Sequence, residues 1–145
     1  MHYWDTSTLA KLYISEPDST LFEGHLASAG TAVTSELTRW EFFRVAARKE
    51  AEGYIGAGKA EVVFARFLAD VAVGRVTLLP FDETLENRYR DLVLRLHRLK
   101  PPIMSRTLDC MHLATAELPG AEEIVATDAG LRKAAGALGI KIFPP

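Results

Sequence analysis

Apolar and polar positions along this chain follow two different spacings. Short apolar runs bounded by turn residues predict five mostly buried strands, at residues 2–4, 31–34, 76–79, 123–127 and 140–143. Between them, apolar residues recur every three or four positions, which is the spacing of an amphipathic helix. Helices are predicted over residues 6–15, from residues 17–18 to beyond 26, and over residues 36–52, 59–73, 82–99, 105–118 and 128–138.

This alternation of strands and helices predicts an α/β fold, a central parallel sheet with helices on both faces. The length of 145 residues fits a single domain that spans residues 1–145. In sheets of this kind, ligands bind beyond the carboxyl ends of the strands, where the strand order reverses. Candidate chemistry is therefore to be sought in residues that directly follow strands.

Composition limits the function classes. With 48% apolar and 25% charged residues the chain is ordinary globular protein, and its formal net charge is −2. Contact with nucleic acid would need a local basic patch or a bound cation. The single cysteine, Cys110, allows no internal disulfide and no cysteine-rich zinc site. No signal peptide or membrane-spanning run is visible, so we expect a cytoplasmic protein.

Four acidic residues stand where such a fold would bring them together. Asp5 directly follows the first strand, and Asp128 directly follows the fourth. Glu41 lies one to two turns into the helix over residues 36–52, and Asp109 lies in a nearly all-apolar stretch of the helix over residues 105–118. Crowded carboxylates repel one another, and a divalent cation such as Mg²⁺ or Mn²⁺ relieves that repulsion. Such a cation can hold a phosphodiester and activate a water molecule.

Each of these residues also has an ordinary structural interpretation. Asp5 and Asp128 could cap the helices that follow them, since Asp is a common N-cap. Glu41 could be a surface charge. Asp109 could lie on a polar stripe or pair with His112, which we expect to have a structural rather than a catalytic role.

Four segments in the same order resemble the motifs of the PIN-domain nucleases, especially the VapC-type toxins of type II toxin–antitoxin pairs. The third segment, with its Leu-Asp-x-x-His-Leu-Ala-x-Ala pattern, is the most specific. The four segments are Tyr3-Trp4-Asp5-Thr6-Ser7, Thr34-Ser35-Glu36-Leu37-Thr38-Arg39-Trp40-Glu41, Leu108-Asp109-Cys110-Met111-His112-Leu113-Ala114-Thr115-Ala116 and Ala126-Thr127-Asp128.

The resemblance implies a three-layer α/β/α sandwich with strand order 3-2-1-4-5. It puts Asp5, Glu41, Asp109 and Asp128 at the family's acidic metal-site positions. It further implies endonucleolytic cleavage of RNA with Mg²⁺ or Mn²⁺, a homodimer, and inhibition by a cognate antitoxin protein. A catalytically silent PIN-like binding module and a housekeeping RNA-processing nuclease stay open as alternatives. The first motif lacks the second Asp of haloacid-dehalogenase-like enzymes, and the residues after the first and third strands do not fit a receiver domain.

Several further residues are candidates for supporting roles. Ser7 and Thr127 could hydrogen-bond a ligating carboxylate or simply lie at helix starts. Glu36 is the rival of Glu41 and could be an outer carboxylate. For the RNA backbone, the candidate cations are Arg39, Arg44 and Arg106, with Arg48 and Lys49 nearby, although each could be an ordinary surface charge.

Two further features of the sequence bear on contacts with other molecules. Ala129 and Gly130 stand where family members often carry a basic residue, which puts phosphate contacts there in doubt. We expect the large apolar residues of the first and third helices to be core, although some could line a groove for a second copy or an antitoxin helix. They are Leu9, Leu12, Trp40, Phe42 and Phe43.

Overall fold

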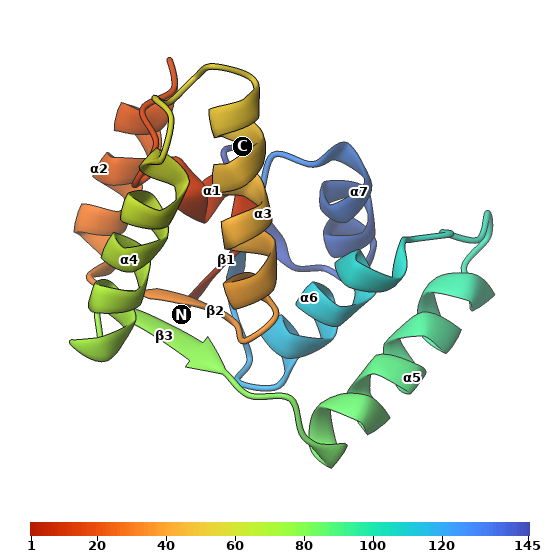
Figure 1. The fold of residues 1–145 in the computed structure, drawn as a ribbon. Coiled ribbons are helices and arrows are strands. Elements are labelled where there is room, and N and C mark those ends of the chain that lie inside the picture. Colours follow the sequence, from red (N-terminus) through yellow and green to blue (C-terminus); the bar gives the residue numbers. More distant parts are fainter.

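Five short strands form one parallel sheet at the centre of the computed structural model, which describes residues 1–145 (Figure 1). The strands lie in the order β3-β2-β1-β4-β5, so the predicted α/β fold and strand order 3-2-1-4-5 are confirmed. At the centre, β1 and β4 pair in parallel, with Tyr3 opposite Ile124. The strands are β1 His2–Trp4, β2 Ala32–Ser35, β3 Val76–Leu79, β4 Glu123–Val125 and β5 Lys141–Phe143.

Seven helices connect and flank the strands. The first is shorter than predicted, because the helix ends at Ala10 and the chain continues through turns at residues 11–13. The third begins at Thr38 rather than Glu36, because the Glu36 amide still bonds to Leu79 O (2.8 Å) as part of the sheet ladder. The helices are α1 Thr6–Ala10, α2 Ser19–Ala29, α3 Thr38–Ala51, α4 Lys59–Ala72, α5 Glu83–Arg98, α6 Thr107–Glu117 and α7 Ala129–Ala137.

The sheet separates two hydrophobic cores, because successive residues of a strand point to opposite faces. Tyr3 and Ile124 pack with residues of α5, α6 and α7, whereas Trp4 and Val125 pack with residues of α1 to α4. All four of these strand side chains are completely buried. The molecule is therefore the three-layer α/β/α sandwich that was expected.

The large apolar residues of the first and third helices were expected to be core, with an apolar surface as the alternative for some, and two of them are not core. Leu9 and Phe42 are fully buried, but Trp40 is 72% exposed and Phe43 is 37% exposed. The reason is the helix repeat: α3 packs Phe42 and Ala46 inward at a spacing of four residues, which turns Trp40 outward.

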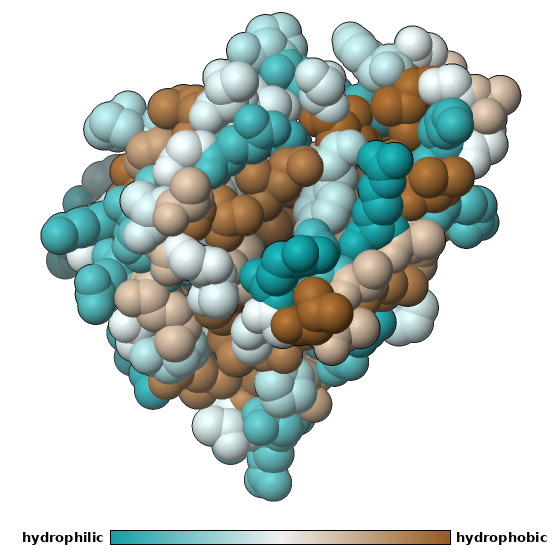
Figure 2. All heavy atoms as spheres, turned by 90° about the vertical axis from the view of Figure 1, so that its left-hand side faces the viewer, coloured by the Kyte–Doolittle hydropathy of each residue, from teal (hydrophilic) through white to brown (hydrophobic).

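Apolar side chains also reach the surface elsewhere. Figure 2 shows the side of the molecule formed by α2 and α4, where brown apolar patches lie among teal hydrophilic residues. Leu21 of α2 and Val62 of α4 are each more than 40% exposed. None of the helices has the length and apolar character that crossing a membrane would require.

Candidate active site

One polar cleft lies beyond the carboxyl ends of β1 and β4, and all four predicted carboxylates line it. It has a volume of about 320 Å³ and is built from four separate parts of the chain. Asp5 enters at the end of β1, Glu41 from α3, Asp109 from α6 and Asp128 from the start of α7. The other residues that line it are Thr6, Ser7, Arg44, Val45, Arg48, Arg106, Thr107, Leu108 and His112.

Asp5 and Asp128 are both helix caps and cleft residues, so the two interpretations of the sequence hold together. Asp5 Oδ2 accepts hydrogen bonds from the backbone N–H (3.2 Å) and the hydroxyl of Ser7, at the start of α1. Asp128 Oδ1 accepts the N–H of Leu131 (2.9 Å) at the start of α7. Because each cap uses one carboxylate oxygen, it orients the side chain and leaves the other oxygen toward the cleft.

Asp109 and Asp128 are held by one guanidinium. Arg106 donates from Nε and Nη2 to the two oxygens of Asp109, at 2.8 and 3.1 Å, and from Nη2 to Asp128 Oδ2 at 2.8 Å. Asp109 is only 8% exposed, and a buried carboxylate of this kind needs such a partner. The possible pairing of Asp109 with His112 is therefore not what the structure shows.

Glu41 is held by His112 instead. His112 Nε2 lies 2.7 Å from Glu41 Oε2 and 4.0 Å from Asp5 Oδ1, and its Nδ1 shares a 2.7 Å hydrogen bond with the Tyr3 hydroxyl. The Thr6 hydroxyl donates to the same Glu41 oxygen. From the sequence, no role was predicted for Thr6, and His112 was expected to be structural rather than catalytic or to pair with Asp109. The signal was present, because His112 follows Asp109 by three residues and therefore shares its face of α6.

These contacts shift the acid–base properties of the cleft. Burial raises the pKa of Asp5, although the charge of His112 and the Ser7 hydroxyl oppose it. Burial also acts to raise the pKa of Glu41, but the hydrogen bond and charge of His112, with Thr6, outweigh it and lower that pKa. Burial acts to lower the pKa of His112, and Glu41, Asp5 and Asp109 together raise it. His112 and Glu41 thus favour each other's charged forms.

Asp128 is also kept ionised. The Leu131 N–H lowers the pKa of Asp128 most, burial opposes this effect, and Arg106 lowers the pKa further. Its carboxylate is thus negatively charged at neutral pH, where it can interact with a cation.

The donor set of the cleft fits a hard divalent cation. Its acidic side chains offer carboxylate oxygens, the ligands that Mg²⁺ and Mn²⁺ prefer. In the structure these carboxylates form two sets. Arg106 binds Asp109 and Asp128, whereas His112 pairs with Glu41 and lies 4.0 Å from Asp5. No three ligand atoms of the cleft lie within 4.8 Å of one another. An ion that draws the two sets together would therefore have to replace Arg106.

The remaining predicted site residues divide into those that reach the cleft and those that do not. Ser7 and the guanidinium residues Arg44, Arg48 and Arg106 line it. Arg39 does not, and Lys49 pairs with Glu16 at 3.1 Å.

The two other supporting candidates lie outside the cleft. Thr127 is exposed and makes no side-chain hydrogen bond. Glu36 is half-buried, and its backbone N–H donates to Leu79 O in the sheet. The structure therefore gives neither residue a contact with the four carboxylates.

The structure gives a reason why position 130, just after Asp128, carries glycine and no basic residue. A Cβ on Gly130 would lie 3.1 Å from Asp128 Oδ1, so a larger residue would crowd the Asp128 carboxylate. Arg132 points away, donating to the carbonyls of Ala126 and Pro144. Arg106 is the basic residue beside Asp128 in this chain.

Comparison with known proteins identifies the family of this chain. The PIN domain family model matches residues 3–137. Ribonuclease VapC46 of Mycobacterium tuberculosis is 32% identical over 145 residues, which covers 99% of this chain and 96% of that protein. Ribonuclease VapC47 of the same species is 38% identical over 120 residues, covering 80% of this chain and 74% of that protein.

Solved structures share the fold at lower identity. FitAcB from Neisseria gonorrhoeae has a TM-score of 0.72 and 21% identity, covering 100% of this chain and 98% of that chain. VapBC2 from Rickettsia felis, solved bound to a DNA fragment from its promoter, has a TM-score of 0.65 and 17% identity, covering 98% and 97%. With a family model over nearly the whole chain and relatives above 30% identity, this chain belongs to the PIN domain family.

Proposed function

We propose that this chain is a metal-dependent endoribonuclease that hydrolyses RNA phosphodiester bonds, and that it is the toxin of a toxin–antitoxin pair. The observation that carries the proposal is the single cleft lined by Asp5, Glu41, Asp109 and Asp128. The ribonuclease names of two relatives, at 32% and 38% identity, support the reaction class. We propose one nuclease domain over residues 1–145, acting in the cytoplasm, where its RNA would be.

The same four carboxylates are the residues that would hold Mg²⁺ or Mn²⁺. When bound, the ion would neutralise the carboxylates, bind a phosphate oxygen and lower the pKa of a water molecule. The chain's own part is to orient these ligands. Ser7 fixes the Asp5 carboxylate, and Thr6 and His112 fix Glu41.

Positive charge at the cleft would bind the RNA backbone. Arg44 and Arg48 line the cleft, and guanidinium groups suit phosphate because of their planar set of donors. The Arg106 side chain is 70% exposed, so it has room to turn from Asp109 and Asp128 toward a phosphate when a metal ion takes the carboxylates. The chain as a whole has a net charge of −2, and the three arginines at the cleft would supply the local positive charge that RNA binding requires.

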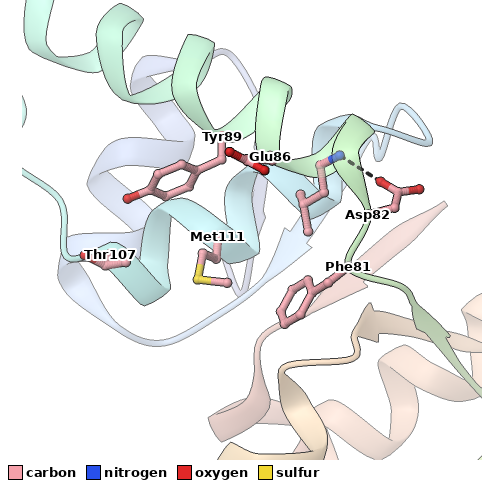
Figure 3. Close-up of a pocket in the computed structure, with 7 residues that line it drawn as sticks. Phe81, Asp82, Glu86, Tyr89, Thr107 and Met111 are labelled. Atoms are coloured by element: carbon pink, nitrogen blue, oxygen red, sulfur yellow. Dashed lines mark hydrogen bonds between the residues drawn. The ribbon is translucent and has the colours of Figure 1, made fainter.

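Two exposed apolar surfaces are available for the expected protein partners. Trp40 lies one turn before Arg44 on α3, so it borders the cleft and could receive an antitoxin that blocks it. A second surface is the pocket of about 440 Å³ between the start of α5 and α6 (Figure 3). Phe81, Tyr89 and Met111 surround it, and we propose that it contacts a second copy of the chain.

The proposed activity can be tested on purified protein free of any antitoxin. Total RNA is incubated with Mg²⁺ or Mn²⁺, or with EDTA, and the Asp109→Asn variant is run in parallel. We expect discrete fragments that require the metal and disappear in the variant. Asp91→Asn is the matched control, because Asp91 is an exposed residue of α5 away from the cleft. Absence of cleavage on several RNAs by the folded wild-type chain would instead favour a silent binding module.

A further inference from the structure

A second cluster of metal-ligating side chains lies away from the cleft, at the amino ends of the central strands. His2 and Glu123 are the first residues of β1 and β4, and they are direct register partners. They therefore point to the same face of the sheet. On that face His25 of α2 lies against them, with its ring stacked on His2 at a centroid separation of 4.9 Å.

The ligand atoms of these three residues converge. His2 Nδ1, His25 Nε2 and a Glu123 oxygen all lie within 4.8 Å of one another, and no other set of three His, Cys, Asp or Glu side chains in the chain does so. Glu123 Oε1 is 2.8 Å from His25 Nε2 and 3.6 Å from His2 Nδ1. The carboxylate oxygen is thus shared between two imidazole nitrogens.

All three atoms are buried without a hydrogen-bond partner. His2 Nδ1, His25 Nε2 and Glu123 Oε1 are shielded from solvent, and even the 2.8 Å contact lacks the alignment of a hydrogen bond. Buried polar atoms are almost always satisfied, and leaving three together unsatisfied is unfavourable. An ion among them would satisfy all three at once.

We propose that His2, His25 and Glu123 form a structural Zn²⁺ site. Two imidazole nitrogens and one carboxylate oxygen are ligands that Zn²⁺ takes up readily, whereas Mg²⁺ prefers oxygen alone. The three protein ligands leave one tetrahedral position for water. Because the ligand atoms are enclosed, the site is suited to holding segments together rather than to admitting a substrate.

Aromatic neighbours hold the two histidines in a stack that zinc binding would have to change. The His25 ring is stacked on Phe143 of β5 at 3.7 Å and packs against Trp4, and its side chain is only 11% exposed. A zinc ion lies in the plane of each imidazole that it binds, so the nearly parallel His2 and His25 rings would turn about χ2 on binding. That torsion has a broad, shallow preference in histidine.

Such an ion would connect three segments that lie far apart in the sequence. It would tie α2 to β1 and β4, and β1 has only three residues of its own. Zinc binding should therefore stabilise the fold. This inference does not depend on the nuclease proposal, because the cluster lies at the other end of the strands from the cleft.

Isothermal titration with Zn²⁺ in the presence of excess Mg²⁺, together with thermal unfolding, tests the site. We expect one Zn²⁺ per chain and a higher melting temperature for the wild type. Binding should weaken at least tenfold and the thermal shift should vanish in His25→Gln and Glu123→Gln. Two controls should keep both effects: His97→Gln, an exposed histidine of α5, and Asp5→Asn, which removes a cleft carboxylate.

A second measurement guards against variants that fold poorly. Co²⁺ added to the wild type should give the visible absorption of a four-coordinate ion, and this should be lost in His2→Gln, a change at the partly exposed first residue of β1. Equal Zn²⁺ affinity in the wild type and the His25→Gln/Glu123→Gln double variant would overturn the proposal, as would no Zn²⁺ binding by the folded wild type. Loss of zinc binding in Asp5→Asn alone would move the ion to the cleft and also overturn it.

Discussion

Arg106 forms a two-pronged ion pair with Asp109, with its Nε and Nη2 atoms 2.8 and 3.1 Å from the two carboxylate oxygens. The carboxylate is buried, but the side chain of Arg106 is 70% exposed. An exposed protein cation therefore stands beside a buried anion, at the position where a metal ion is expected to act.

Replacing Arg106 should strengthen metal binding and weaken catalysis. In Arg106→Ala no internal cation competes for Asp109 and Asp128, so we expect Mn²⁺ affinity to rise about tenfold, or about 1.4 kcal/mol. Cleavage at saturating metal should fall, because a phosphate contact is lost. Calorimetry with Mn²⁺ and RNA cleavage measure the two effects. Arg106→Lys keeps the charge without the paired geometry, so its Mn²⁺ affinity and its cleavage should lie between those of the wild type and Arg106→Ala. Weaker Mn²⁺ binding by Arg106→Ala than by the wild type would contradict this prediction.

Asp5→Asn should abolish cleavage without unfolding the protein. The change removes a ligand charge, but Asn is as good an N-cap as Asp, so the start of α1 should persist. We expect at least a hundredfold loss of metal-dependent cleavage and a melting temperature within a few degrees of the wild type. Asp82→Asn is the control, because Asp82 caps α5 in the same way, through the Leu85 N–H, and lies outside the cleft. Undiminished cleavage by Asp5→Asn would remove Asp5 from the proposed site.

The pairing of His112 and Glu41 should make the metal-free protein's stability depend on pH. The pKa of His112 is raised from its ordinary 6.5, so its contribution is full below pH 6.5 and is lost as pH rises through the raised value. The pKa of Glu41 is lowered from 4.5, so its contribution is full above pH 4.5 and is lost as pH falls through the lowered value. The stabilisation is therefore greatest between these two pH values.

The measurement compares wild type with His112→Asn by denaturant unfolding in EDTA at several pH values. We expect the variant to be less stable by about 3 kcal/mol between pH 4.5 and 6.5, as for a buried pair that loses one partner. The gap should narrow as the pH rises further. A gap that is constant from pH 5 to pH 9 would show that packing, and not the ion pair, is what the variant loses.

A charge introduced at either of the two exposed apolar surfaces should disrupt only the partner that binds there. Phe81→Asp, in the pocket of α5 and α6, should convert a dimer into a monomer by light scattering, because it puts a charge into the proposed contact. Trp40→Asp should leave the dimer intact and weaken inhibition by the antitoxin. If Trp40→Asp instead lowers RNA cleavage in the absence of antitoxin, Trp40 stacks on RNA bases rather than on a protein.

Much of this protein is determined locally by its sequence. The apolar runs are short enough for strands, and the stripes between them have the helical repeat, so seven helices and five strands could be predicted within a few residues. One error lies where two local signals meet, because Ser35 and Glu36 join the sheet ladder before α3 begins. The other is the end of α1, which lies at Ala10 rather than Ser15. Asp5 was found because a residue just after a buried strand must emerge at the sheet's carboxyl edge. Asp128 was predicted to follow its strand directly, but β4 ends at Val125 and Asp128 is the N-cap of α7.

Only the tertiary structure decided which charges meet. Arg106 and Asp128 are 22 residues apart, and Glu41 and His112 are 71 residues apart, so no helical or strand spacing joins them. The outward turn of Trp40 depends on which face of α3 the sheet selects. The cluster of His2, His25 and Glu123 exists because β1 lies beside β4 and α2 covers that face. Side chains far apart in sequence become neighbours only through the packing of whole elements, which a local pattern does not contain.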